Sequence, residues 1–356
     1  MTVPSSAAVA GSPGSPGPLL SVTGLSVTFP TPDGDVRAVR DIDLTLERGE
    51  TLGIVGESGS GKSTVALAAL GLLPRGARVA GSVRCAGREL LGLSETELAT
   101  VRGGTIAYIP QDPLTSLNPA FTVGWQVAEA LWTRGLMSKQ DARRRAVELL
   151  DVVGIPQAAR RAGSYPHEFS GGMRQRVVIA IAMAADPDVM IADEPTTALD
   201  VTIQAQVLDA LRSARDATGA SLLLITHDLG VVAGMADRVT VMYAGKAVES
   251  GGVDEVFYHS QMPYTLGLLG SMPRLDRGSE AGPLRPIPGS PPSLIGLPPG
   301  CPFAPRCPVV VERCRQEAPP LEPAGEGGGH LVACHRAGSL PPEAYGDGAG
   351  PADGPA

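Results

Sequence analysis

The residues best suited to chemistry lie at positions 56–63, which read Gly-Glu-Ser-Gly-Ser-Gly-Lys-Ser. The glycines let the backbone turn sharply, so that its N–H groups can approach phosphate oxygens. Lys62 can reach the β- and γ-phosphates of a nucleotide, and the Ser63 hydroxyl can ligate Mg²⁺. A glycine-rich turn can carry a lysine by chance, but only three of the 29 basic residues in this chain are lysines. The expected phosphate contacts are Gly56, Glu57, Ser58, Gly59, Ser60, Gly61, Lys62, Ser63 and Thr64.

The elements on either side of this loop must hold it in place. Residues 51–55 are mostly apolar and strand-like, and residues 62–73 read as a helix. A strand–loop–helix order is the context in which this pattern is credible. The helix also points its positive N-terminal end toward the phosphates. The sequence therefore predicts a nucleoside triphosphate site at the start of this helix.

A second apolar run, residues 189–192, leads directly into Asp193 and Glu194. At the carboxyl edge of a parallel sheet, such an acidic pair lies near the phosphate loop. Asp193 suits an interaction with Mg²⁺, and Glu194 can orient and deprotonate an attacking water. Many strands end in an exposed acidic residue, so this pattern gains its value from the patterns around it.

Four further features complete the set. Residues 169–176 read Phe-Ser-Gly-Gly-Met-Arg-Gln-Arg and open an apolar helix at about 173–185, whose start can offer N–H groups to an anion. Gln111 and His227 each follow a strand-like run. Taken singly, each is more often a solvated loop residue, but their order around a phosphate loop is consistent with one site. The candidate residues of the run 169–176 are Ser170, Gly171 and Gly172, and Asp200 is the fourth feature.

This ordered set resembles the nucleotide-binding domain of ATP-binding cassette (ABC) transporters over residues 20–260. The family's parts fall here at the Walker A motif (56–63), the Q-loop (Gln111), the signature (169–173), the Walker B motif (189–194), the D-loop (198–200) and the switch histidine (His227). Phe169 and Met173 depart from the commonest signature, which has Leu and Gln there. The resemblance implies an α/β P-loop NTPase with a helical subdomain at 112–180.

The resemblance also implies roles for these residues. Two domains would close head-to-tail over two ATP molecules, with the signature of one completing the site of the other. Lys62, Glu194, Gln111 and His227 would be catalytic, and Gln111 would join Ser63 and Asp193 at Mg²⁺. Phe29 stands where the family places an aromatic that stacks on adenine, although an edge-strand phenylalanine packed in the core is almost as good an interpretation.

Composition limits the class of protein. The longest apolar stretch, 177–185, has nine residues and is too short to span a bilayer. A net charge of −8 argues against a nonspecific nucleic-acid binder. No charged-then-apolar leader is seen at the N-terminus, so we expect a protein that is not exported. Segments 1–19 and 337–356 are rich in Gly, Pro and Ala and are predicted to be disordered.

The segment 261–336 resembles the C-terminal extension of oligopeptide and dipeptide permease ATPases, and the signature form resembles that of the first, D-type subunit. Four of the five cysteines lie in it: Cys301, Cys307, Cys314 and Cys334. Their spacing matches no standard short zinc finger or ferredoxin motif, so free thiols remain an alternative to a metal site. Thiolates suit a [4Fe–4S] cluster or zinc, and the resemblance favours iron–sulfur. Cys85 is expected to be a small buried apolar residue. His330 and His335 are expected to be surface histidines, with a role as substitute metal ligands as the alternative.

The two resemblances together imply an ATPase subunit that energises di- and oligopeptide uptake with ATP and Mg²⁺. The resemblance implies two transmembrane permease subunits, a second ATPase in a heterodimer, an extracytoplasmic peptide-binding protein and no nucleic acid, at the cytoplasmic face of the membrane. A nickel or other small-solute importer of the same group is an alternative. A non-transport ABC ATPase is another, although such proteins usually carry two cassettes, a coiled-coil insertion or basic arms.

Overall fold

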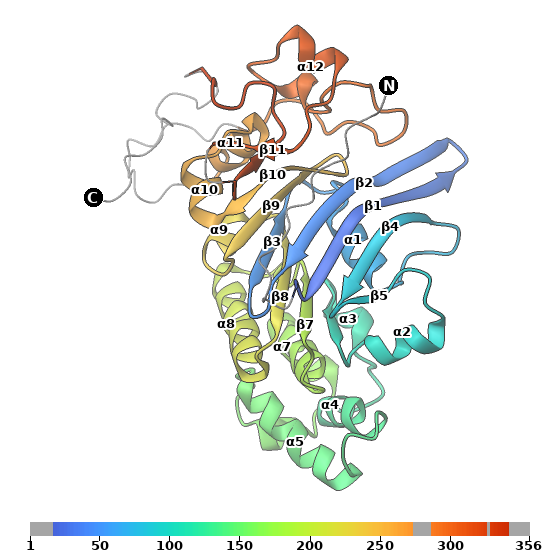
Figure 1. Cartoon of the computed structure of the whole chain (residues 1–356). Coiled ribbons are helices and arrows are strands. Elements are labelled where there is room, and N and C mark those ends of the chain that lie inside the picture. The colour runs from blue at the N-terminus through green and yellow to red at the C-terminus, as the bar shows by residue number, and fades with distance from the viewer. Residues whose placement is uncertain (1–16, 273–285, 326–327, 342–356) are drawn as a thin grey trace, which may run out of the picture.

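The predicted site residues that follow strands lie at the carboxyl edge of the larger of two sheets (Figure 1). This sheet has eight strands in the order β11-β12-β10-β9-β3-β8-β7-β6, and its five strands from β9 to β6 are parallel. Its strands are β3 (Thr51–Val55), β6 (Ile106–Ile109), β7 (Val189–Asp193), β8 (Ser221–Thr226), β9 (Arg238–Tyr243), β10 (Lys246–Gly252), β11 (Glu322–Pro323) and β12 (Leu331–Val332). The computed structural model describes residues 17–272, 286–325 and 328–341.

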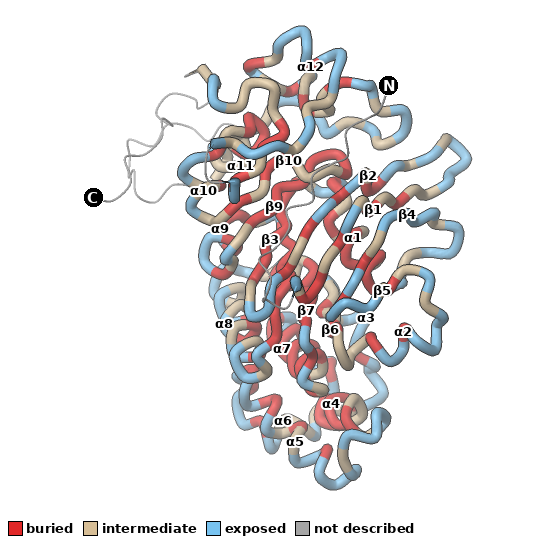
Figure 2. Tube along the Cα trace, in the orientation of Figure 1, coloured by how far each residue is buried: buried red, intermediate tan, exposed pale blue. Residues whose placement is uncertain are grey.

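Both faces of the central strands are buried, and this explains their unbroken apolar runs. Along β7, Val189 and Ile191 pack into one core cluster while Met190 and Ala192 pack into the other. Alternate side chains of a strand point to opposite faces, so each strand serves two cores. Figure 2 shows these strands as the buried centre of the molecule. Strands predicted at 51–55 and 189–192 are thus confirmed as β3 and β7.

A smaller antiparallel sheet covers one of these faces together with helix α1 (Lys62–Ala69). Its order is β2-β1-β4-β5, with apolar side chains of β1 and β2 directed into the shared core. The strands are β1 (Leu20–Thr31), β2 (Gly34–Leu46), β4 (Arg78–Cys85) and β5 (Arg88–Glu89), and α2 (Glu95–Val101) follows them. Cys85 is only 3% exposed, as predicted, and burial raises the pKa of its thiol to about 11.

Helices form the other face and the lower part of Figure 1. Short polar residues start several of them by accepting a backbone N–H: Thr122, Ser138, Ser170 and Asp200. The elements are α3 (Pro113–Ser116), α4 (Val123–Trp132), α5 (Lys139–Val152), α6 (Ala158–Arg161), the 3₁₀ turn η1 (Pro166–Glu168), α7 (Gly171–Met183) and α8 (Val201–Thr218). Helix α7 begins two residues before the predicted position, because Ser170 caps it.

The C-terminal extension is built onto the larger sheet. Strand β12 pairs with β10 and β11 pairs with β12, so the extension lengthens the sheet at its edge. A third core cluster joins the extension to β9 through Tyr243, Tyr264, Phe303 and Val332. The remaining elements are α9 (Leu229–Ala233), α10 (Val253–Tyr258), α11 (Pro263–Gly270), the 3₁₀ turn η3 (Ala304–Arg306) and α12 (Glu312–Gln316).

The segments 1–19 and 337–356 were predicted to be disordered. Most of their residues, 1–16 and 342–356, lie outside the described part of the chain. Leu19, at the border of the first segment, is 2% exposed and its N–H donates to the Leu46 carbonyl. Residues 337 and 338 end a turn at 335–338, in which the Gly338 N–H donates to Gln261 Oε1. None of the helices in the described ranges combines the length and the apolar character that crossing a membrane requires.

Candidate active site

The phosphate loop connects β3 to α1, and two of its glycines are required by close backbone contacts. Gly56 has φ 154°, and a Cβ there would lie 2.2 Å from the Met242 carbonyl oxygen. Gly61 has φ 100°, and its Cβ would lie 2.3 Å from the Ala38 carbonyl oxygen. Any side chain at either position would push the loop away from the sheet. The fold therefore fixes the loop that the sequence predicted.

Lys62 lies inside this loop and is only 4% exposed. Its Nζ donates to the carbonyl oxygens of Gly56 at 2.7 Å and Glu57 at 2.9 Å. Burial lowers the pKa of Lys62, and the carboxylates of Glu194, Asp193 and Glu57 oppose that effect. The result is a cation held at the centre of an acidic neighbourhood, where it can meet an anionic ligand.

Asp193, at the end of β7, is held by two hydroxyl groups. Ser63 Oγ donates to its Oδ1 at 2.8 Å, and the Tyr108 hydroxyl donates to its Oδ2 at 2.9 Å. Burial raises the pKa of Asp193, and the two hydrogen bonds act in the opposite direction. A serine hydroxyl beside a carboxylate is a donor set that Mg²⁺ accepts, so these residues fit the predicted ion.

Glu194 adopts a left-handed backbone conformation with φ 46°, which is uncommon outside glycine. Its Oε2 accepts hydrogen bonds from Gln111 Nε2 at 3.3 Å and Thr197 Oγ1 at 2.8 Å, and it lies 3.3 Å from His227 Nδ1. Its Oε1 lies 4.0 Å from Lys62 Nζ. Strained backbone is found at sites where geometry must be fixed for function. This arrangement aims one carboxylate at the mouth of the phosphate loop.

The loop, the acidic edge and the smaller sheet surround one cleft of about 800 Å³. The cleft brings together predicted site residues whose positions in the sequence range from 29 to 227. Phe29 is in the wall, beside Val36 and Ala38 of the same sheet. The predicted residues that line it are Phe29, Gly56, Glu57, Ser58, Gly59, Ser60, Gly61, Lys62, Ser63, Thr64, Gln111, Glu194 and His227.

The signature residues and Asp200 do not line this cleft. Ser170 and Gly171 are exposed at the start of α7. The Ser170 hydroxyl accepts the N–H of Met173 at 3.4 Å, and Asp200 accepts that of Ile203 at 3.0 Å, so both residues cap helices within this chain. Ser170 and Gly171 are thus exposed outside the cleft, while Phe169 and Gly172 are buried.

Comparison with known proteins agrees with this geometry. Residues 39–197 match the ABC transporter family, and residues 248–314 match the oligopeptide/dipeptide transporter C-terminal region. The chain is 54% identical over 318 residues to the oligopeptide transport ATP-binding protein OppD of Salmonella typhimurium, covering 89% of this chain and 93% of that protein. The chain belongs to the ATP-binding proteins of oligopeptide and dipeptide ABC transporters.

Other members of this ABC family extend the comparison. OppD of Mycobacterium tuberculosis is 58% identical over 320 residues, which cover 90% of this chain but 52% of that protein. The chain thus spans about half the length of the first curated relatives it matches. A solved dimeric ATP-binding cassette in a post-hydrolysis state, bound to ADP and Pi, has a TM-score of 0.58 and 27% identity, covering 66% of this chain and 98% of that chain. The ABC cassette fold predicted from the sequence is confirmed.

Sequence patterns missed four residues of this ABC site. Tyr108 bonds to Asp193 and Thr197 bonds to Glu194, and each lies within four residues of a predicted position. The extension supplies the other two, because Tyr264 and Arg306 both contact Glu57 of the phosphate loop. Proximity along the chain could have suggested the first pair. No local pattern signals the second, since their partner lies more than 200 residues away.

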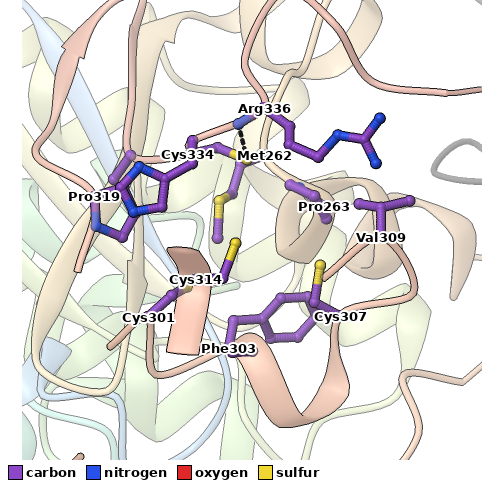
Figure 3. A pocket seen from close by; sticks show the side chains of 13 residues that line it. Met262, Pro263, Cys301, Phe303, Cys307, Val309, Cys314, Pro319, Cys334 and Arg336 are labelled. Atoms are coloured by element: carbon purple, nitrogen blue, oxygen red, sulfur yellow. Dashed lines mark hydrogen bonds between the residues drawn. The ribbon is translucent and has the colours of Figure 1, made fainter. Parts of the chain in front are cut away.

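The cysteines predicted as ligands gather around a second, small cavity in the extension of this ABC protein (Figure 3). Its volume is about 20 Å³, and Met262 and Phe303 also line it. Burial raises the pKa of the Cys307 thiol to about 11 and that of Cys301 and Cys334 in the same direction, and neighbouring cysteines add to the effect. The four cysteines are Cys301, Cys307, Cys314 and Cys334.

The two histidines of the extension differ from each other. His330 was expected at the surface, but it is 7% exposed and its Nε2 lies 2.9 Å from Oε1 of the fully buried Glu249. That expectation was wrong because a carboxylate on β10 requires a partner inside the core. His335 is partly exposed, lines the cysteine cavity and pairs with the Glu317 carbonyl at 3.0 Å.

Proposed function

We propose that this chain is the ATP-binding and ATP-hydrolysing subunit of an ABC importer that energises the uptake of di- and oligopeptides. The observation that carries this proposal is the convergence on one cleft of Lys62, Ser63 and Glu194, with Asp193 hydrogen-bonded to Ser63 behind it. The match of the extension to the oligopeptide/dipeptide transporter C-terminal region supports the peptide class. Residues 20–260 would be the ATPase domain, 112–180 its helical subdomain and 261–336 the extension.

The position of each residue in the site suits it to a specific role. The loop amides and Lys62 bind the phosphates and neutralise their charge, while Phe29 offers its ring to the base. Ser63 and Asp193, with Gln111 near them, would hold Mg²⁺, which when bound neutralises charge on the β- and γ-phosphates. Glu194 takes the proton of the attacking water, and Gln111, Thr197 and His227 hold its carboxylate in place.

The exposed part of the signature, Ser170 and Gly171, supports a head-to-tail dimer. Ser170, Gly171 and Gly172 present the N-terminal end of the 13-residue helix α7, an anion-binding feature. Asp200 lies nearby, since Gly171 and Gly172 pack against Leu199 and Ile203. This surface would contact the γ-phosphate held by a second ATPase subunit, and loss of that phosphate would open the dimer.

The partners follow from the same proposal. Two transmembrane permease subunits would supply the channel, a second ATPase would complete a heterodimer, and an extracytoplasmic binding protein would deliver peptide. The chain would then act peripherally at the cytoplasmic face of the membrane, without nucleic acid. A nickel or other small-solute importer of this group is the second candidate, because the cleft binds nucleotide and contains no feature that selects the solute.

The test is ATP hydrolysis by the assembled complex, with and without peptide. Glu194→Gln keeps the shape of the side chain but cannot take a proton, so we expect turnover to be lost while the ATP-bound dimer persists. Hydrolysis at the wild-type rate in this variant would contradict the assignment of Glu194. Stimulation by nickel and not by peptide would favour the second candidate.

We also propose that the four cysteines hold a metal centre, an iron–sulfur cluster as the family resemblance implies. The donor set fits, because all four cysteines line one cavity and thiolates are the usual ligands of iron–sulfur clusters and of zinc. The cysteines do not form a complete metal site as they stand. In the described ranges, no group of three or more His, Cys, Asp or Glu side chains is placed so that it could hold a metal ion. Binding would therefore have to draw the cysteines together.

Metal analysis of protein purified without oxygen tests this proposal. We expect iron and acid-labile sulfide in the full chain, and their loss in Cys307→Ser. The buried Cys85→Ser is the matched control and should keep both. Zinc in place of iron would reassign the metal, and the absence of both would leave the four thiols free.

A further inference from the structure

We propose that Arg306 of the C-terminal extension is a positioning residue of the phosphate loop, acting through Glu57. This inference rests on the proposed function, since it assigns to the extension a part in nucleotide binding. Arg306 Nη1 donates to Glu57 Oε2 at 2.7 Å, and Nη2 donates to Oε1 at 2.9 Å. The two residues are 249 positions apart in the sequence.

Where it does not contact Glu57, the guanidinium of Arg306 is surrounded by groups of the extension and of β9. Its Nε donates to the Pro288 carbonyl at 2.8 Å, and Nη1 lies 3.2 Å from the Tyr243 hydroxyl. Its central carbon lies 5.8 Å from the ring centre of Tyr243 and 5.9 Å from that of Phe303. The Arg306 side chain is only 5% exposed. A planar fork held in this way can fix the orientation of a carboxylate, which a single ammonium cannot.

Glu57 is held at its backbone as well as at its carboxylate. Its N–H donates to the Tyr264 hydroxyl at 2.8 Å, so the extension contacts the residue twice. Its carbonyl oxygen accepts the Lys62 Nζ at 2.9 Å. Tyr264 is fully buried and packs at 4.5 Å, centre to centre, against the Tyr243 ring that also contacts Arg306. One rigid aromatic cluster therefore anchors the second residue of the phosphate loop.

The ion pair between Arg306 and Glu57 changes the charge that a nucleotide meets in the cleft. Glu57 lines the cleft, and an unpaired carboxylate there would repel a triphosphate. The fork of Arg306 neutralises that carboxylate and keeps it turned toward the extension. A glutamate in the phosphate loop is thus compatible with an anionic ligand because a residue of the extension covers its charge. Loss of Arg306 would both loosen the loop and leave the negative charge free.

The first experiment measures the affinity of the purified full chain for a fluorescent ATP analogue with Mg²⁺. We expect Arg306→Ala to weaken binding by about tenfold or more, because it leaves the partly buried carboxylate of Glu57 unpaired in the cleft. The matched control is Arg313→Ala, which removes an exposed ion pair with Glu317 in the same extension. This control should bind as the wild-type chain does.

A second comparison separates positioning from mere stability. The double variant Glu57→Gln/Arg306→Ala has no unpaired carboxylate, so it should bind the analogue more tightly than Arg306→Ala alone. A residue that only stabilised the fold would give no such recovery. Arg306→Lys keeps the charge without the fork and serves if the alanine variant does not fold, with an expected weakening of about threefold.

The outcomes are distinct. Arg306→Ala and Arg306→Lys binding as tightly as Arg313→Ala, or a double variant that binds no better than Arg306→Ala, would overturn the inference. A wild-type chain that binds no analogue would instead contradict the proposed function. In the assembled complex, the expected change is a higher KM for ATP with a smaller effect on kcat.

Discussion

The hydroxyl of Tyr108 donates a hydrogen bond of 2.9 Å to Asp193 Oδ2, on the side of the carboxylate opposite Ser63. Strands β6 and β7 pair in parallel, with Tyr108 beside Ile191, so the sheet register delivers this contact. Burial raises the pKa of Tyr108, and the charge of Asp193 adds to that effect, so the phenol stays a donor. One oxygen of the proposed Mg²⁺ ligand is therefore oriented by a neighbouring strand.

Tyr108→Phe should raise the Mg²⁺ concentration needed for half-maximal ATP hydrolysis by about tenfold, since a hydrogen bond to a charged group is lost. The variant should also lose activity at a higher pH than wild type on the acid side. The Tyr108 bond lowers the pKa of Asp193, so its removal raises that pKa and the carboxylate protonates sooner as the pH falls. Rates measured across Mg²⁺ concentration and pH test both effects. Identical curves would show that Tyr108 does not position Asp193.

Gly172→Ala should destabilise the fold. A Cβ at position 172 would lie 2.1 Å from Ile203 Cγ2, so α7 and α8 must separate at a cost of about 2 kcal/mol. Gly171→Ala is the matched control, because its Cβ would lie at an ordinary 3.5 Å from Leu199 Cδ2. Denaturant unfolding of the two variants gives the comparison. Equal stabilities would show that the close contact is relieved without cost.

His330→Ala should destabilise the full chain by about 2 kcal/mol, because the buried Glu249 loses a hydrogen-bond partner. Ser260 and the Gln261 N–H would still bond to Glu249, which limits the loss. His335→Ala, at a partly exposed position, should cost about 0.5 kcal/mol or less. Unfolding midpoints measure both. An effect of the same size in the two variants would contradict a specific role for His330.

Cys85 should resist alkylation in the folded protein. With a thiol pKa of about 11, only about one molecule in a thousand carries the thiolate at about pH 8. The thiolate, which reacts, appears as the pH approaches the raised pKa, and the residue is also shielded from reagent. Mass spectrometry of peptides after iodoacetamide treatment measures the modified fraction, with protein in denaturant as the reference. Rapid labelling without denaturant would show that this strand opens readily.

The sequence alone determined the local parts of the site. Gly56, Gly61 and Lys62 could be assigned because a phosphate loop needs specific backbone angles and a cation at fixed spacing, and those needs are met within one short segment. The central strands β3 and β7 were equally predictable, since burial on both faces demands an unbroken apolar run. The chemistry of these segments is contained in their own residues.

Tertiary structure alone decided which distant side chains complete that site. Arg306 and Tyr264 reach Glu57 because the extension packs against Tyr243 of β9. His330 reaches Glu249 because β12 pairs with β10. A local pattern specifies the conformation of its own segment and the polar groups it must satisfy. The partner of each group depends on how the cores pack, and this is a property of the whole chain.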